Sequence, residues 1–319
     1  MEPLGAAGFL STLARIALLA CGHHHRGPCR SWPSCRTQNV QNRRSSPVSD
    51  TTAEAGVSRD LRPWERAPAV RTIAQGTDPG TGDLWLLLED LEDHRAADGA
   101  EGASDPDAFA TVSALARWHA AWWNDERLTS LDWLPATPDP LISGYGQIFD
   151  WTWEMCVDRL GGVDPEVAAS ARAGRTWFDT AVREFAAGDR TLVHGDARLD
   201  NVLFAPEGDA VLIDFQLASH GRGAYDLAFF CAGSLRTADR RRLEPALLDH
   251  YRTTLAERGV AVRLDELWRD YRLGLMLNLP HPVSALAAVT PADERGARFL
   301  RRNAQRGLAA VADHVGLLG

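Results

Sequence analysis

Lysine is absent from this sequence. All 34 basic residues are arginines, which stand against 43 acidic residues and leave a net charge of −9. The charge is uneven, because residues 1–50 hold six arginines and two acids, whereas residues 51–319 hold 28 arginines and 41 acids. An acidic body argues against nucleic acid as the main partner and suits a neutral or cationic small molecule somewhat better. The length of 319 residues, with 45% hydrophobic content, allows two modest domains of an ordinary globular protein.

Cysteines are few and irregularly spaced. They stand at positions 21, 29, 35, 156 and 231. An odd number without framework spacing argues against a disulfide scaffold in a chain of this length and predicts a reducing, cytoplasmic setting. The first three, with the histidines at 23–25, could be read as a metal cluster, but no CxxC or HxxxH spacing orders them. We therefore do not expect a metal site there.

No apolar run is long enough to span a membrane. Residues 9–21 resemble the core of a signal peptide, but no basic residue precedes them and Arg15 interrupts them. The sequence therefore predicts a soluble protein without a membrane partner, and it holds no signal for an oligomeric state.

The N-terminal part of the chain lacks a recognisable secondary-structure pattern. Residues 22–56 are rich in Arg, Ser, Pro, Cys and Gln and show neither a period of two nor one of 3.6, which is typical of a loop or of disorder. A regular pattern begins near Ala69. Residues 69–75 and 83–91 flank a glycine-rich turn at Gly76–Gly82, so we predict a β-hairpin whose apolar second strand is buried on both faces.

Helices and three short strands are predicted in the rest of the chain. Ser104 or Asp105 is expected to cap a helix with Pro106 in its first turn. His119 falls on the apolar face of this helix, and we interpret it as a hydrogen-bonded core histidine rather than a ligand. Further amphipathic helices are predicted at 165–187, 237–257, 262–278 and 292–316, and strands at 191–194, 202–204 and 210–215.

Polar residues gather around these three strands. The loop His194-Gly-Asp-Ala-Arg-Leu-Asp-Asn201 places Asp196 five positions before Asn201, and Asp214 ends the third strand. Phosphoryl transfer needs a carboxylate that orients or deprotonates the acceptor hydroxyl, and ligands for Mg²⁺. The D-x-x-x-x-N spacing is that of a kinase catalytic loop. Asp and Asn are also common in turns, but turn preference explains neither the His-Gly pair nor the carboxylate at the end of an apolar strand.

These motifs resemble those of the aminoglycoside phosphotransferase and choline or ecdysteroid kinase-like (CHK kinase-like) family, a branch of the protein-kinase fold. The resemblance covers roughly residues 69–315. It implies that Asp196 is the catalytic base, that Asn201 and Asp214 hold Mg²⁺, and that His194 braces the loop. Gln216 then stands where protein kinases have the glycine of Asp-Phe-Gly.

Two further segments resemble parts of the same family. Residues 221–230 resemble the segment in which an aspartate on a helix ties the catalytic-loop backbone, which gives Asp226 a structural role. Residues 86–91 resemble the hinge strand that meets the adenine ring through backbone groups, so the resemblance places Glu89, Asp90 and Leu91 at the nucleotide. The implied cofactors are ATP and Mg²⁺.

Arg198 admits two interpretations. Its position, two residues after the expected base, would let its cation face the transferring phosphoryl group and offset the charge of that group. Alternatively it is a solvent-facing arginine paired with Asp200 on the same loop.

The start of the chain departs from the family pattern. A working small lobe supplies a Gly-rich loop and a strand lysine paired with a helix glutamate, and neither is recognisable here. An arginine is not equivalent to that lysine at a tight phosphate site. Either residues 1 to about 56 are not the natural beginning, through a displaced start or a shift of reading frame, or this is a truncated relative that kept its Mg²⁺ ligands. We favour the first explanation, because charge and composition change abruptly beside a regular domain.

We therefore predict a bilobal, protein-kinase-like α+β fold with a reduced or degenerate N-terminal β lobe and a mainly helical C-terminal lobe. Residues 1–56 would be a poorly patterned segment, 57–91 the remnant of the small lobe and hinge, and 92–319 the large catalytic lobe. The expected activity is transfer of the ATP γ-phosphoryl group to a hydroxyl of a small molecule, such as an aminoglycoside-like sugar, a choline-like amino alcohol or a sterol-like alcohol. The acceptor pocket would lie among the helices after residue 230, beside Asp196.

Two rival functions stay open at this point. One is a catalytically inert pseudokinase that binds a nucleotide or a protein partner and acts by shape. The other is transfer of a nucleotidyl rather than a phosphoryl group.

Overall fold

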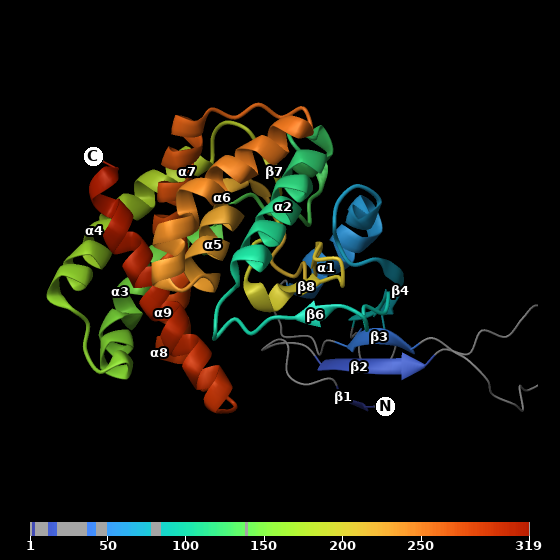
Figure 1. The fold of residues 1–319 in the computed structure, drawn as a ribbon, viewed down its shortest axis with the longest axis horizontal. Coiled ribbons are helices and arrows are strands. Elements are labelled where there is room, and N and C mark those ends of the chain that lie inside the picture. The colour runs from blue at the N-terminus through green and yellow to red at the C-terminus, as the bar shows by residue number, and fades with distance from the viewer. Residues whose placement is uncertain are drawn as a thin grey trace, which may run out of the picture.

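Two lobes of unequal size make up the molecule, a β-rich N-terminal lobe and a larger helical lobe (Figure 1). The structure, a computed structural model, describes residues 2–3, 12–17, 37–42, 50–77, 84–137 and 140–318. The predicted fold class, a bilobal α+β fold of the protein-kinase type, is confirmed.

A five-stranded antiparallel sheet forms the small lobe, in the order β1-β2-β3-β5-β4. Helix α1 (Asp50–Gly56), a π-helical turn (Val57–Leu61) and a short 3₁₀ turn (Pro63–Glu65) come between β3 and β4 in the chain (Figure 1). The strands are β1 (Glu2–Pro3), β2 (Thr12–Ala17), β3 (Thr37–Asn42), β4 (Thr72–Thr77) and β5 (Leu84–Leu88).

The small lobe differs from the sequence-based expectation in two respects. Within the segment 22–56, where the pattern predicts a loop or disorder, lie strand β3 and helix α1. The hairpin of β4 and β5 is confirmed, but burial of β5 on both faces is wrong, because Trp85 is 37% exposed whereas Leu86 is 1% exposed. The turn residues 78–83 and the cysteines and histidines between 21 and 35 lie outside the described residues. The proposed domain boundaries at 56 and 91 stay a prediction.

A chain connection and a backbone bridge join the two lobes. Residues 89–94 lead from β5 to β6 (Arg95–Ala96), which pairs with β8 (Val202–Phe204) in the large lobe. Strand β9 (Ala210–Leu212) completes a three-stranded sheet of order β6-β8-β9. Leu212 of β9 also forms a bridge to the segment before β4, since its N–H donates to Pro68 O (2.9 Å) and its carbonyl accepts from Val70 N (3.0 Å).

The large lobe is mainly helical, and helices α2, α4, α6, α7 and α9 lie where the pattern predicts them. Ser104 caps α2, because its hydroxyl accepts from Asp107 N (3.3 Å). The helices are α2 (Asp105–Ala121), α3 (Pro140–Leu160), α4 (Pro165–Phe185), α5 (Ala224–Ser234), α6 (Thr237–Glu257), α7 (Leu264–Asn278), α8 (Pro280–Ala288) and α9 (Glu294–His314). The sequence pattern does not reveal α3 and α8.

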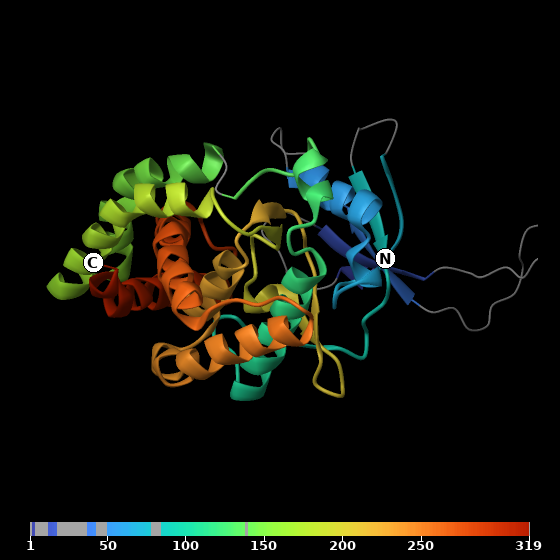
Figure 2. The same ribbon diagram turned by 90° about the horizontal axis from the view of Figure 1, so that it is seen from above.

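Helix α5 lies at the centre of the helical lobe, where it packs against α7 and α9 (Figure 2). Its residues Leu227, Ala228, Phe230 and Cys231 are fully buried. A helix that is apolar on nearly all sides is typical of a protein core, and α5 forms the core of this lobe. Within the described residues, no helix is both long and apolar enough to cross a membrane.

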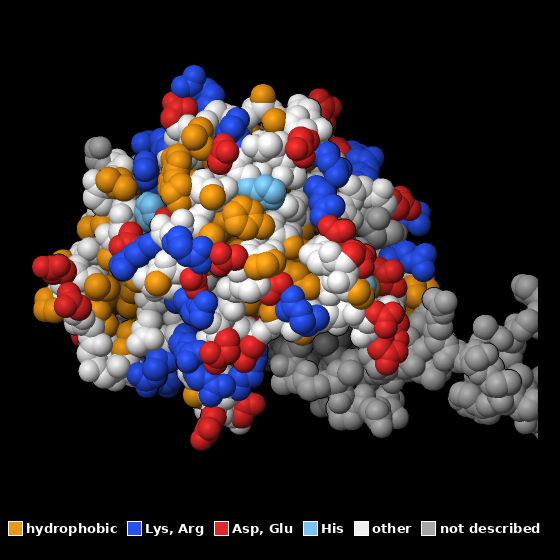
Figure 3. All heavy atoms as spheres, in the orientation of Figure 1, with side chains coloured by type: hydrophobic (Ala, Val, Ile, Leu, Met, Phe, Trp, Pro, Cys, Tyr) orange, Lys and Arg blue, Asp and Glu red, His pale blue; other side chains and the backbone are white. Residues whose placement is uncertain are grey.

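The visible face of the helical lobe mixes charges of both signs. Figure 3 shows arginine and acidic side chains interspersed over this face. Arg242 of α6, for example, pairs with Asp105 (2.8 Å) and Asp239 (3.1 Å).

Candidate active site

Two loops face each other because their flanking strands are paired. Residues 194–201 connect β7 (Thr191–Val193) to β8, and residues 213–218 connect β9 to β10 (Ser219–Gly221). β7 pairs with β10 and β8 with β9, so both ends of each loop are held beside the other loop. Ile213 N donates to Asn201 O (3.1 Å), and His194 Nε2 lies 3.0 Å from Ile213 O. The structure thus brings Asp196, Asn201 and Asp214 to one place.

The backbone at this place is sterically constrained. Gly195 has φ +83°, and a Cβ there would collide with the carbonyl oxygen of Leu217 on the facing loop. Glycine is the residue that tolerates both conditions. Asp214 also has a positive φ, +68°, which is uncommon for a residue with a side chain and is typical of functional sites.

Asp196 lies in a cluster of polar groups and is 5% exposed. Asn201 Nδ2 donates to the Asp196 carbonyl (2.9 Å) and to its carboxylate Oδ2 (3.0 Å). Arg198 Nη2 lies 3.3 Å from the same carboxylate oxygen. The Asp196 side chain is therefore held in place from two sides.

The backbone of the catalytic loop is held by Asp226 of α5. Its carboxylate accepts from His194 N (2.6 Å) and from Gly195 N (2.9 Å). His119 Nε2 lies 3.0 Å from Asp226, and His119 Nδ1 lies 2.8 Å from the hydroxyl of Tyr251. Asp226 and His119 are both fully buried, so His119 is the hydrogen-bonded core histidine that the sequence indicates.

Aromatic side chains support the two loops from the α2 side. The ring of Trp118 stacks on the ring of Phe215 with 5.0 Å between centroids. The imidazole of His194 lies 5.3 Å from the Phe215 ring. Trp118 Nε1 also donates to Leu192 O (2.6 Å) in β7, just before the 194–201 loop. Trp118 is fully buried, so it serves core packing.

The oxygen donors at the site fit Mg²⁺. Asn201 uses its amide nitrogen for Asp196, which leaves Oδ1 as the atom to offer to a cation, and Asp214 adds a carboxylate that is 9% exposed. Mg²⁺ is usually bound through one or two carboxylates together with substrate phosphates, rather than by an all-protein cage. No group of three or more His, Cys, Asp or Glu suited to a metal occurs in the described residues.

Arg198 and Asp200 do not pair with each other. Asp200 Oδ1 instead lies 2.5 Å from Arg295 Nη2 of α9, while Arg198 lies against Asp196. The interpretation of Arg198 as a solvent-facing partner of Asp200 is therefore wrong. The reason is that α9, about 95 residues further along the chain, supplies a competing guanidinium.

Glu89, Asp90 and Leu91 lie in the connection between the lobes. Arg71 and Glu89 are bonded twice, since Glu89 N donates to Arg71 O (2.9 Å) and Arg71 N donates to Glu89 Oε1 (2.7 Å). Leu91 O accepts from His94 N (2.9 Å) in a turn. These bonds fix the connection to the residue that precedes β4.

Two further residues carry no signal in the sequence pattern. Glu54 lies on α1 and is only 2% exposed, and the helix that presents it is not apparent from the sequence. His281 lies on α8, and burial lowers its pKa to about 4, partly opposed by the negative charge of Asp196. His281 is brought near Asp196 by tertiary packing over a separation of 85 positions, which no local spacing could indicate.

The fold is similar to that of several solved small-molecule kinases. The wild-type aminoglycoside 2'-phosphotransferase-IIIa, solved with GDP, has a TM-score of 0.58 at 15% identity, over 99% of this chain and 92% of that one. An ethanolamine kinase from Plasmodium vivax has a TM-score of 0.58 at 13% identity, over 98% of this chain and 81% of that one. The choline kinase LicA from Streptococcus pneumoniae gives 0.52 at 14% identity, over 88% of each chain. At this level of identity the similarity establishes the fold alone.

Sequence comparison assigns the family. None of the curated proteins matches this sequence. The model of the phosphotransferase enzyme family, by contrast, matches residues 40–261, which include both loops of the site, the connection between the lobes and helix α5. The chain therefore belongs to the phosphotransferase enzyme family.

Proposed function

We propose that this chain transfers the γ-phosphoryl group of ATP to a hydroxyl of a small molecule. In this proposal Asp196 accepts the proton of the acceptor hydroxyl as its oxygen bonds to phosphorus, and ADP leaves with the bridging oxygen. The observation that carries the proposal is the convergence of Asp196, Asn201 and Asp214 on two loops held by paired strands. Membership of the phosphotransferase family supports it.

Asn201 Oδ1 and the Asp214 carboxylate are the groups that would hold Mg²⁺. Bound by these residues, Mg²⁺ would supply positive charge that offsets the negative charge of the phosphates. Arg198 would contribute to the same charge balance from its position 3.3 Å from Asp196. Asp226 and His194 would keep the loop backbone in register, and Glu89, Asp90 and Leu91 would face the adenine ring through the backbone.

The absence of lysine bears on how the phosphates are held. Strand β3 is Thr-Gln-Asn-Val-Gln-Asn and contains no basic residue. Glu54 of α1 is a candidate for the helix glutamate of the family's lysine–glutamate pair, with no lysine in the chain to meet it. We infer that the Mg²⁺ ligands carry more of the nucleotide affinity here than in a relative that has the lysine. Cytoplasmic location is part of the proposal, and the free, buried thiols of Cys156 and Cys231 are consistent with it.

Replacement of the base tests the proposal. Asp196→Asn should lower the turnover of an accepted alcohol by about 10²–10⁴-fold, the range for a positioned general base, with melting temperature unchanged. Asp209→Asn is the matched control, because Asp209 is an exposed aspartate in the β8–β9 turn and should keep full turnover. Phosphate transfer is measured across a panel of hydroxyl compounds.

Other results would assign other functions. Binding of Mg-ATP by calorimetry without any turnover that depends on Asp196 would favour the inert pseudokinase. AMP joined to the product, detected by mass spectrometry, would indicate nucleotidyl transfer. Either result would refute the proposed activity.

A further inference from the structure

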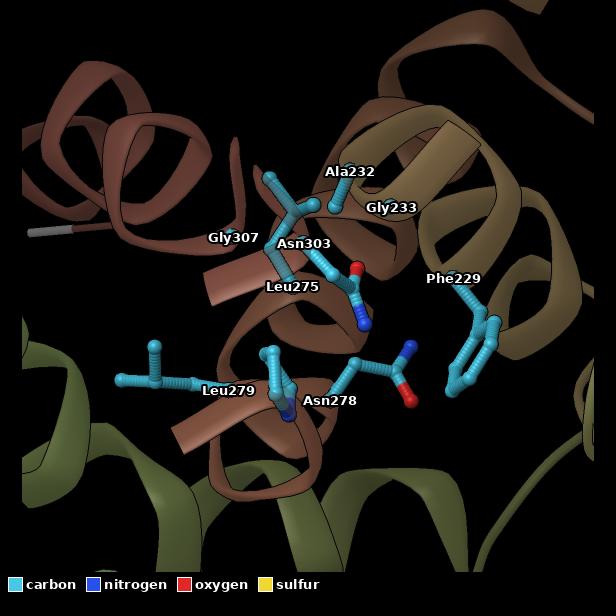
Figure 4. Close-up of a pocket in the computed structure, with 9 residues that line it drawn as sticks. Phe229, Ala232, Gly233, Leu275, Asn278, Leu279, Asn303 and Gly307 are labelled. Carbon is cyan, nitrogen blue, oxygen red and sulfur yellow. The ribbon is translucent and has the colours of Figure 1, made fainter. Parts of the chain in front are cut away.

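A small recess lies where α5, α7, α8 and α9 meet (Figure 4). Its volume is about 20 Å³, which is room for one small group such as a hydroxyl or a water molecule. Phe229 and Gly233 of α5, Asn278 at the end of α7, Pro282 of α8 and Asn303 of α9 are among the residues that line it. None of the nine lining residues carries a charge.

Asn278 presents an unsatisfied acceptor in this recess. It is 5% exposed, its Nδ2 donates to Tyr225 O (3.1 Å), and its Oδ1 has no hydrogen-bond partner among the described residues. Figure 4 shows the amide of Asn303 pointing toward Asn278, with the ring of Phe229 beside them. Buried polar atoms are normally paired, so an orphan oxygen beside a second amide indicates a place for a ligand donor.

The recess adjoins the candidate active site. Gly233 of its wall precedes Ser234, whose hydroxyl accepts from Leu199 N (3.0 Å) in the catalytic loop. On the other side, His281 is the neighbour of Pro282, lies 5.7 Å from the Phe229 ring and is 3.0 Å from the Tyr225 hydroxyl. The negative charge of Asp196 acts on His281, which places His281 in the neighbourhood of the expected base.

The chemistry of the lining selects the kind of group that can enter. A protonated amine or a quaternary ammonium loses its hydration in a recess of this size and finds no carboxylate in return. A hydroxyl can donate to Asn278 Oδ1 and accept from the amide of Asn303 at the same time. The aromatic ring of Phe229 offers an apolar surface to the carbon skeleton that carries the hydroxyl.

We propose that this recess is an acceptor subsite for an uncharged hydroxyl or hydroxymethyl group, and that the acceptor is an uncharged, sugar-like polyol rather than a polyamine or a quaternary ammonium alcohol. The inference rests on the proposed function, since a second hydroxyl of the same molecule would face Asp196. Asn278 and Asn303 are then the residues that determine specificity.

Matched acceptor pairs test the subsite. Glucose is compared with glucosamine, and galactose with galactosamine, in phosphoryl transfer from Mg-ATP at neutral pH. The uncharged member of a pair should have a kcat/KM at least tenfold higher than its amine. An equal or higher value for the amine in both pairs would overturn the inference.

A charge placed in the recess sharpens the test. Asn303→Asp keeps the shape of the side chain and adds one negative charge, so the ratio of sugar to amino sugar should shift at least tenfold toward the amine. Gln305→Glu adds the same charge two residues along α9, at an exposed position outside the recess, and should leave the ratio as it is. An unchanged ratio in a folded Asn303→Asp protein, checked by its melting temperature, would refute the role of Asn303.

Failure of the subsite and failure of the proposed function give different results. Transfer that depends on Asp196 and prefers amines leaves the phosphotransferase function intact and overturns the subsite. If no acceptor is phosphorylated, the proposed function fails. The subsite is then tested by calorimetric titration of the protein with the same sugar pairs in the presence of a non-hydrolysable ATP analogue. Selective binding of the uncharged member supports it, whereas binding of the amine or of neither member overturns it.

Discussion

At the scale of single residues, the conformation of the 194–201 loop depends on Gly195 and on the carboxylate of Asp226. Gly195 combines a positive φ with a close approach to Leu217, and Asp226 is the acceptor for two adjacent backbone N–H groups. A buried N–H without a partner costs about 1–3 kcal/mol, so the loop and the carboxylate of α5 are strongly coupled. The position of Asp196 is therefore set by residues that would not touch a substrate.

His281 should make stability depend on pH below neutrality. Its pKa is about 4 in the folded protein, lowered by burial, against about 6.5 in the unfolded chain. Above pH 6.5 the imidazole is neutral in both states, and as pH falls toward 4 the unfolded chain binds a proton that the folded protein does not. Folding stability is then lost, by about 2 kcal/mol at pH 5. Urea unfolding at pH 7.5 and 5.0 should show this loss in the natural protein and a loss smaller by about that amount in His281→Gln. Equal losses in the two proteins would contradict the assignment.

At the scale of elements, a buried charged network joins α6, α7 and α9. Glu244 of α6 receives Arg240 Nη1 at 3.0 Å, His314 Nε2 at 2.8 Å and the hydroxyl of Tyr271. Arg240 is 1% exposed and also contacts Asp313. The network holds three helices of the lobe together through side chains that are almost fully dehydrated.

Removal of the central carboxylate should be costly. Glu244→Ala leaves the guanidinium of Arg240 buried with one partner fewer, and the expected loss in free energy of unfolding is about 3–5 kcal/mol. Glu257→Ala, at the exposed end of the same helix, should stay within about 0.5 kcal/mol of the natural protein. Chemical denaturation measures both, and a loss below 1 kcal/mol for Glu244→Ala would show that the network is weak.

The elements also show what a sequence can and cannot reveal. α4 and α9 have one apolar face each, and their pattern locates them to within about two residues. β3 is polar at five of six positions, and its pairing with β2 and β5 makes it a strand. α8 begins with two prolines within three residues, and such a pattern predicts a turn rather than a helix. Local spacing therefore finds elements with a period and overlooks those created by tertiary contacts.

The same distinction applies to the site. Asp196, Asn201 and Asp214 are close in sequence, so their spacing reveals them. Asn278, His281 and Asn303 come from three separate helical segments, and only the packing of α5 against α7 and α9 brings them near the catalytic loop. The chemistry of the expected reaction could be inferred from the sequence, whereas the features that would select the acceptor could not.

At the scale of the whole molecule, the lobes are held by a chain connection and by the bridge at Leu212. The bridge lies two residues before Asp214, so a movement of the small lobe is transmitted to that carboxylate. A nucleotide that contacts both lobes should slow amide hydrogen exchange at Val70 and Leu212, because opening must break their bonds. Gly161, in the turn between α3 and α4, serves as the control amide and should be unaffected by Mg-ATP. Equal exchange at Val70 and Leu212 with and without nucleotide would contradict the coupling.

The bridge has a second consequence, for aggregation. β9 is an edge strand of its sheet, and residues 68–70 cover its outer edge. An uncovered strand edge is a template on which another polypeptide can add. Parting of the lobes would expose this strand edge next to the 194–201 loop, so the bridge also protects the molecule against association with other chains.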